Sequence, residues 1–240
     1  MKAILKGLAD VVFPPRCMAC GNVLSEQEDR PFCPTCVSRI QYISSPLCPC
    51  CGIPMLGTEG TDHFCGACLL SRPSFSVARA VARYETILLD AIHAFKYSGK
   101  ITNGQTLGKM MADYGYHDFN ISSYSLIIPV PLHRRRLRER GFNQSAILAR
   151  EIARRFSLPL DLLSLKKHIF TGAQVGLGKN QRTSNVKGAF DVRDNKKIEG
   201  QKIILVDDVY TTGSTVKECA RVLMKNKAAE VAVLTLARAV

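Results

Sequence analysis

Along residues 76–240, segments in which hydrophobic residues follow the period of a strand alternate with segments in which they follow the period of a helix. Strands are expected where apolar residues alternate or run without interruption, and helices where they recur every three or four positions. Strands are predicted over residues 76–84, 125–131, 160–165, 202–208 and 230–237, and helices over 87–96, 104–114, 143–156 and 214–226. Residues 166–190 are polar, contain several glycines and show no clear period, so they are predicted to form a mobile loop.

The order of these elements indicates the fold class. Alternating strands and helices with nearly continuous apolar strands imply an α/β fold, with a mostly parallel sheet covered by helices on both faces. Pro73 marks a change of composition, which divides the chain into residues 1–72 and 73–240.

Residues 4–12 carry apolar side chains at helical spacing, but Lys6 and Asp10 interrupt them as they would not in a signal peptide. No apolar run approaches the roughly 18–20 residues of a membrane span. We therefore expect a cytoplasmic protein whose short N-terminal helix packs on its own chain.

Nine of the ten cysteines lie between residues 17 and 68, and eight of these nine form four Cys-x-x-Cys pairs. The pairs are Cys17 with Cys20, Cys33 with Cys36, Cys48 with Cys51, and Cys65 with Cys68. Two such turns supply the four thiolates that zinc prefers, so the spacing predicts two zinc ions in a double zinc ribbon. All-cysteine ligation leaves no open position for water, and both ions are therefore expected to be structural.

Disulfide bonds are the competing interpretation of these cysteines. A chain without a secretion signal is expected in a reducing compartment, which favours free thiolates and metal. The loops within the two halves are 12 and 13 residues long, which favours sequential over crossed pairing of the Cys-x-x-Cys turns. Cys50 could replace a member of the third pair, but Gly52 follows Cys51 directly and permits the tight turn that favours Cys51.

The net charge of +13 belongs to the second part of the chain. Residues 1–78 hold six Lys/Arg and six Asp/Glu, whereas residues 79–240 hold 27 and 14. Residues 133–155 alone contain eight arginines, whose guanidinium groups suit phosphate oxygens. The charge favours a polyanion or a phosphorylated small molecule as the partner, and a merely solvated basic surface is the alternative.

The segment IILVDDVYTTGSTVKE at 203–218 is the strongest candidate for a binding site. An apolar strand delivers Asp207 and Asp208 to the end of the sheet, and a threonine-rich turn then opens a helix. A helix N-terminus preceded by small and hydroxyl residues binds phosphate through backbone N–H groups, while carboxylates accept hydrogen bonds from sugar hydroxyls. This combination predicts a site for a ribose 5-phosphate. An ATPase is disfavoured because the sequence lacks G-x-x-x-x-G-K-[ST].

The string VDDVYTTGST resembles the phosphoribosyl-diphosphate (PRPP) loop of type I phosphoribosyltransferases. PVPLHRRRLRERGFNQS at 129–145 and QVGLGKNQRTSNVKGAF at 174–190 narrow the resemblance to the ComF family of competence-associated proteins. Those proteins also begin with a cysteine-rich zinc module, and the resemblance covers about residues 10–240. It implies a type I phosphoribosyltransferase-like domain at 73–240, preceded by a helix and a double zinc ribbon at 1–72.

The resemblance also implies roles for single residues. Asp207 and Asp208 would meet the ribose hydroxyls, and Mg²⁺ would accompany PRPP. The 5-phosphate would be held by Thr211, Thr212, Gly213, Ser214 and Thr215. The loop from Leu132 to Asn143 would bind pyrophosphate, with Arg136, Arg140 and Asn143 as candidate contacts. Residues 166–190 resemble a flexible lid, in which Lys179 and Arg182 are candidate anion contacts.

Two functions are compatible with these observations. The resemblance implies a PRPP-binding protein linked to DNA uptake, which transfers a phosphoribosyl group to an unknown acceptor. The chain departs from purine-salvage relatives at Thr211, where those enzymes usually carry an acid. The alternative is a non-catalytic single-stranded-DNA-binding adaptor of the competence machinery, which the net charge of +13 favours. An aromatic content of 7% and the absence of Trp leave few stacking platforms for such a strand.

Overall fold

The computed structural model describes residues 14–24, 31–55, 57, 60–97, 101–116, 118–170 and 186–240. The helix expected at residues 4–12 lies outside this part of the chain, and so do Lys179 and Arg182. Within the described residues, no helix combines the length and the apolar content that crossing a membrane requires.

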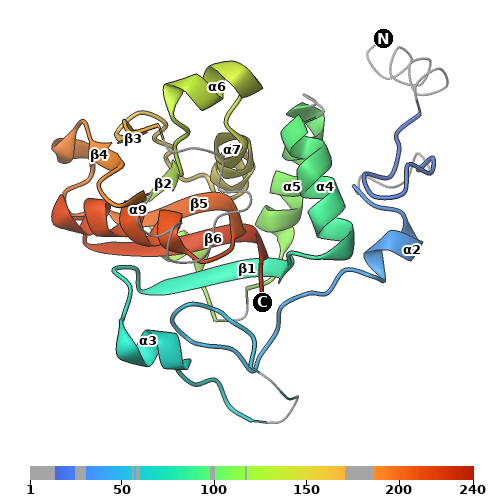
Figure 1. The fold of residues 1–240 in the computed structure, drawn as a ribbon, viewed down its shortest axis with the longest axis horizontal. Coiled ribbons are helices and arrows are strands. Elements are labelled where there is room, and N and C mark those ends of the chain that lie inside the picture. Colours follow the sequence, from blue (N-terminus) through green and yellow to red (C-terminus); the bar gives the residue numbers. More distant parts are fainter. Residues whose placement is uncertain are drawn as a thin grey trace.

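A four-stranded parallel sheet in the order β1-β6-β5-β2 forms the centre of the molecule (Figure 1). Its strands are β1 (Val77–Arg83), β2 (Leu126–Pro129), β5 (Lys202–Tyr210) and β6 (Glu230–Arg238). All four residues of β2 are buried, and in β6 only the first residue is not. Continuous burial is the pattern of strands covered on both faces, so the predicted mostly parallel sheet is confirmed.

Helices cover both faces of this sheet. One layer holds α4 (Thr86–Tyr97), α5 (Ile101–Asp113) and α7 (Gln144–Phe156), and the other holds α9 (Ser214–Lys225). Alternate side chains of β5 pack against opposite layers. Ile204 and Val206 pack with the first layer, and Ile203 and Leu205 pack with α9. This is the two-residue period of a strand. Short 3₁₀ helices are η1 (Ile121–Ser123) and η2 (Asn195–Lys197).

The prediction of a strand at residues 160–165 is wrong. Leu160 forms only a single bridge with Ile127, and strand β3 begins at the end of the segment, as Leu165–Lys167. The carboxylate of Asp161 accepts the N–H groups of Leu163 at 2.8 Å and Ser164 at 3.0 Å. This local turn competes with strand pairing and overrides the apolar run.

Two segments predicted as loops contain regular structure. Helix α6 (Arg134–Arg140) occupies most of the expected loop from Leu132 to Asn143. None of its residues is buried, so it has no apolar period by which the sequence could reveal it. At the two ends of the expected loop 166–190, β3 and β4 (Phe190–Val192) form an antiparallel pair, while residues 171–185 lie outside the described residues.

The cysteine-rich part consists of two copies of one motif. In the first, Arg16 bridges Val23 and helix α2 (Pro34–Val37) follows; in the second, Leu47 bridges Pro54 and helix α3 (Gly66–Leu70) follows. The turns also match, because Gly21 N donates to Cys17 O at 2.9 Å and Gly52 N donates to Cys48 O at 2.8 Å. The repeat confirms the expected double ribbon.

The second ribbon and the segment that leads to it cover the outer edge of β1, beneath the sheet in Figure 1. Ala78 N donates to Cys50 O at 2.7 Å, Ile43 N donates to Val81 O at 3.0 Å, and Arg83 N donates to Gln41 O at 2.8 Å. An uncovered edge strand is a template for aggregation, so the ribbons complete the sheet as well as bind metal. The division of the chain between residues 72 and 73 stays a prediction.

Candidate functional site

A cavity of about 310 Å³ opens at the carboxyl ends of β2 and β5. Its volume lies at the lower end of the range for small-molecule sites, about 300–1,000 Å³. One wall is the turn from β5 into α9, a second follows β2 into α6, and a third comes from the end of β1 and from α4. Open parallel sheets bind ligands at this edge, because helix N-termini and loop side chains converge there.

The turn between β5 and α9 has the geometry of an anion cradle. Gly213 is left-handed, with φ of 73°, and serves as the N-cap of α9. The hydroxyls of Thr212 and Ser214 lie 2.8 Å apart. Lys217 N donates to Gly213 O at 2.8 Å, so the N–H groups of Thr215 and Val216 have no intrahelical acceptor. The structure thus brings the predicted residues 211–215 together at a helix N-terminus that favours negative charge.

The paired acids lie beside this turn and line the same cavity. The Ser145 hydroxyl, from α7, donates to Asp207 Oδ1 at 2.8 Å. Burial raises the pKa of Asp207 to about 7, the negative charge of Asp208 adds to the rise, and the hydrogen bond from Ser145 opposes it. The two carboxylates therefore differ in environment, since Asp208 has a cationic partner.

That partner is Lys96, which no pattern in the sequence indicated. Lys96 Nζ lies 2.5 Å from Asp208 Oδ2, and the two side chains are 20% and 14% exposed. Burial lowers the pKa of Lys96, but the Asp208 carboxylate outweighs burial and the net pKa is raised. Lys96 precedes Asp208 by more than a hundred residues, and no local signal in the sequence connects them.

Two of the basic residues predicted to contact pyrophosphate line the cavity. Arg136 and Arg140 both line the cavity. Arg136 also lies 3.7 Å from Glu139, and the Arg140 guanidinium carbon lies 5.9 Å from the ring centre of Tyr97. Lys167, which was not among the predicted contacts, also lines the cavity and comes from β3.

Asn143 is not among the residues that line the cavity. Its side chain accepts from Ser145 N at 3.1 Å and donates to Val130 O at 3.1 Å, which makes it the N-cap of α7. Two residues of the segment R-G-F-N-Q-S therefore have structural roles. Asn143 starts the helix, and Ser145, two residues later, holds Asp207 in place.

The raised pKa of Asp207 predicts a pH dependence of stability. At pH values below about 4 Asp207 is protonated in both the folded and the unfolded chain, so it favours neither. Between about pH 4 and 7 the unfolded chain releases the proton and the folded chain keeps it, so folding stability falls as pH rises. Asp207→Asn removes this penalty. Urea unfolding should show a variant more stable than the natural chain by at least about 1 kcal/mol at pH 8 and no more stable at pH 4.

The exposed Asp191 supplies the control for this measurement. Asp191→Asn should change the free energy of unfolding by the same small amount at both pH values. A gain from Asp207→Asn that is equally large at pH 4 would contradict the proposed ionisation.

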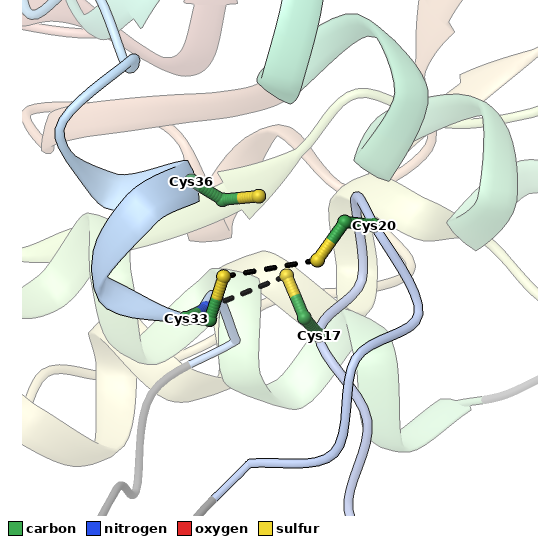
Figure 2. A group of neighbouring side chains, drawn as sticks. All are labelled: Cys17, Cys20, Cys33 and Cys36. Atoms are coloured by element: carbon green, nitrogen blue, oxygen red, sulfur yellow. Dashed lines mark hydrogen bonds between the residues drawn. The ribbon is translucent and has the colours of Figure 1, made fainter.

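The cysteines form two metal-binding groups. In each group the four sulfur atoms lie within 4.8 Å of one another: Cys17, Cys20, Cys33 and Cys36 in the first, and Cys48, Cys51, Cys65 and Cys68 in the second. Figure 2 shows the first group, with its sulfurs turned toward a common centre. The predicted sequential pairing is confirmed, and the Cys50 sulfur belongs to neither group.

The sulfur geometry fits zinc. Zn–S bonds of about 2.3 Å in a tetrahedron place neighbouring sulfurs about 3.8 Å apart. Cys20 and Cys33 have sulfurs 3.7 Å apart, and so do Cys51 and Cys65. Backbone N–H groups support the thiolates in equivalent ways, from Cys33 to Cys17 Sγ at 3.4 Å and from Cys65 to Cys48 Sγ at 3.5 Å. Both groups are therefore structural Zn²⁺ sites.

Family models match both parts of the fold. The family model of the double zinc ribbon domain matches residues 8–69, and that of the phosphoribosyl transferase domain matches residues 143–239. Among solved structures, the chain overlaps the glutamine PRPP amidotransferase from B. subtilis with a TM-score of 0.38. The identity is 22%, and the overlap covers 55% of this chain and 25% of that chain.

Curated relatives match over nearly the whole length. The DNA utilization protein YhgH of Escherichia coli (strain K12) is 34% identical over 210 residues, which are 86% of this chain and 90% of the relative. Competence protein F of Haemophilus influenzae is 30% identical, with 93% and 97% covered. Competence protein ComFC of Bacillus subtilis is 28% identical, with 92% and 94% covered. The chain therefore belongs to the ComF family of competence-related proteins, in which a double zinc ribbon precedes a phosphoribosyltransferase-like domain.

Proposed function

We propose that this protein binds PRPP, together with Mg²⁺, in the cavity at the carboxyl edge of its sheet. One observation carries the proposal: a pair of carboxylates and an anion-binding helix N-terminus open into the same small cavity. A ribose 5-phosphate makes these two demands together, because its hydroxyls need acceptors and its phosphate needs donors. The match of residues 143–239 to the phosphoribosyl transferase domain supports the same ligand class.

Each part of PRPP can be assigned to a part of the cavity wall with complementary chemistry. The 5-phosphate is assigned to residues 211–215, where the N–H groups of Thr215 and Val216 face the turn. The ribose hydroxyls are assigned to Asp207 and Asp208. The pyrophosphate is assigned to the basic wall with Arg136 and Arg140, whose guanidinium groups suit paired phosphate oxygens. Lys179 and Arg182, which lie outside the described residues, remain further candidates for the pyrophosphate.

The acid pair also fits Mg²⁺, because carboxylate oxygens are the hard donors that this ion takes alongside substrate phosphates. When bound, Mg²⁺ would neutralise part of the negative charge of the pyrophosphate. Lys96 forms an ion pair with Asp208, so a ribose hydroxyl or Mg²⁺ at Asp208 has to share or displace this contact. Reducing, cytoplasmic surroundings belong to the proposal, since the zinc-binding thiolates require them.

Transfer of the phosphoribosyl group is the reaction that such a site would support. The bond between the anomeric carbon and the pyrophosphate oxygen breaks, and its electron pair leaves with pyrophosphate. Arg136 and Arg140 stabilise that departing charge while the ribosyl carbon becomes cationic. A nitrogen nucleophile then forms the new bond and loses its proton to solvent. No side chain of the protein needs to become covalently attached.

Calorimetric titration tests the binding step. PRPP with Mg²⁺ should bind one to one, ribose 5-phosphate should bind more weakly, and ribose should not bind, because the turn at 211–215 requires the phosphate. Asp208→Asn should weaken PRPP binding by at least about tenfold, which is one lost charged hydrogen bond. Asp191→Asn, with its exposed side chain, is the matched control. No heat from PRPP at millimolar concentration would sink the proposal.

Pyrophosphate release tests the transfer step separately. The protein is incubated with PRPP, Mg²⁺ and a panel of nitrogen nucleophiles, including purine and pyrimidine bases and ammonium. With a suitable acceptor, the natural protein should release pyrophosphate faster than the Asp208→Asn variant hydrolyses PRPP. Binding without release for any acceptor would leave a PRPP-binding protein and reject the transferase.

As a second candidate function we propose binding of single-stranded DNA. Away from the PRPP cavity, a hollow between α5 and α7 is lined by Lys109, Arg154 and Arg155. Two acids line it as well and pair with the arginines, Glu151 with Arg154 and Asp113 with Arg155. Relatives of this chain carry the names DNA utilization protein and competence protein. Fluorescence anisotropy with a labelled oligonucleotide should show affinity that falls steeply with salt, by a slope of about −0.7 per phosphate contact.

Variants locate the DNA contact. Arg154→Ala combined with Arg155→Ala should lower both the affinity and the salt slope, whereas Lys225→Ala, on the exposed side of α9, should change neither. Affinity that is indifferent to salt would reject an electrostatic DNA surface.

A further inference from the structure

Arg238, at the end of β6, is a buried charged residue that no step of the proposed function uses. Its exposed fraction is 5%, and that of its neighbour Tyr210 is 4%. The described residues contain no carboxylate in an ion pair with Arg238. Burial of an uncompensated charge is costly, so the partners of the guanidinium group need an explanation.

The partners of Arg238 are parts of the second zinc ribbon. Arg238 Nη1 donates to Cys51 O at 2.6 Å, and Nη2 lies 3.7 Å from the sulfur of Cys51. Four thiolates around Zn²⁺ carry a net charge of −2, so the guanidinium group compensates the metal centre. Hydrogen bonds to a ligating sulfur tune the position and the stability of a metal site.

The same guanidinium group also rests on the ring of Tyr210. The Arg238 guanidinium carbon lies 4.1 Å from the ring centre, a cation–π contact within a desolvated region. Tyr210 in turn supports the phosphate turn. A Cβ atom built at Gly213 would lie 2.3 Å from the Tyr210 hydroxyl oxygen, so ring and turn are in direct contact. A continuous packed path thus joins Cys51 to Gly213.

We infer that the second zinc centre and the phosphate-binding turn are energetically coupled through Arg238 and Tyr210, so that each stabilises the other when occupied. Arg238 and Tyr210 are positioning residues: Arg238 holds the ribbon and the Tyr210 ring together, and Tyr210 fixes the height of the turn at Gly213. The inference rests on the proposed binding of PRPP at that turn.

The first zinc centre supplies an internal comparison. By the repeat, Cys20 occupies the position equivalent to Cys51, yet it is exposed, whereas Cys51 is 6% exposed. The first ribbon packs with the layer of α4 and α5, on the other side of the sheet from α9. Ligand binding at the head of α9 should therefore affect one of the two zinc ions.

The experiment uses the full chain with two zinc ions and measures their release to a chelating dye. Because coupling is reciprocal, bound PRPP should tighten the binding of one zinc ion by on the order of tenfold. Saturating PRPP with Mg²⁺ should therefore slow the release of that ion and leave the release of the other unchanged. Equal slowing of both ions, or of neither, overturns the inference. If the natural chain binds no PRPP in calorimetry, the proposed function fails first and the inference fails with it.

A variant tests the path itself. Arg238→Met keeps the length of the side chain and removes its charge and donors, and should weaken PRPP binding by on the order of tenfold with both zinc ions still bound. Arg79→Met is the matched control, since buried Arg79 also touches the second ribbon, at Pro49 O, but is paired with Asp118. PRPP affinity that is unchanged in Arg238→Met, or equally reduced in Arg79→Met, contradicts the path. Should Arg238→Met not fold, the zinc-release measurement on the natural chain decides alone.

Discussion

Replacing Gly213 by alanine is expected to abolish useful binding of PRPP while the protein stays folded. The residue has φ of +73°, which costs an L-residue with a side chain about 1–2 kcal/mol. The new Cβ would also lie 2.3 Å from the Tyr210 hydroxyl, which cannot retreat because Tyr210 is buried against Arg238. The turn has to move instead. Together the two effects amount to about 3 kcal/mol, or on the order of a hundredfold in the Kd measured by calorimetry.

Gly200 is a close control for this substitution. It has the same φ of +73°, but a Cβ there would have no other atom within 4 Å. Gly200→Ala should therefore cost stability through its backbone alone and leave PRPP affinity unchanged. Similar affinities for the Gly213→Ala and natural chains would show that the turn does not bind the phosphate.

Loss of a zinc ligand is expected to have the largest effect on stability. Structural zinc contributes about 10–16 kcal/mol of apparent binding free energy to small zinc domains. Cys48→Ala removes one of four thiolates, and the second ribbon can no longer hold its backbone against β1, where Ala78 N donates to Cys50 O at 2.7 Å. The melting temperature should fall by more than about 10 °C, since each kcal/mol shifts it by about 2–4 °C at this size. Aggregation should follow, because the edge of β1 is uncovered.

Cys50→Ala is the matched control, because Cys50 is 2% exposed, lies beside two zinc ligands and belongs to neither sulfur group. This variant should keep two zinc ions per chain by elemental analysis and melt only a few degrees lower. A Cys48→Ala protein that retains two zinc ions and the natural melting temperature would refute the ligand assignment.

Local patterns were sufficient for much of this molecule. The parallel sheet was predictable because apolar runs of strand length alternate with helical periods, and each signal lies within ten or so neighbouring residues. The turn from β5 into α9 was predictable for the same reason, since Asp207 to Thr215 are consecutive. The predictions were wrong where a local interaction beat the pattern, as at Asp161, and they missed α6, which buries nothing.

What the sequence determined by itself is therefore the chemistry of each short segment: thiolates in pairs, two adjacent acids, and a helix start rich in hydroxyl groups. Only the tertiary structure decided which segments meet. It joined Lys96 to Asp208, Ser145 to Asp207, and Arg238 to both Cys51 and Tyr210. Most of these partners are 62 to 187 residues apart, and Arg238 lies beside Tyr210 because β5 and β6 pair in that register. Such contacts follow from strand order and helix packing, which no stretch of neighbouring residues encodes.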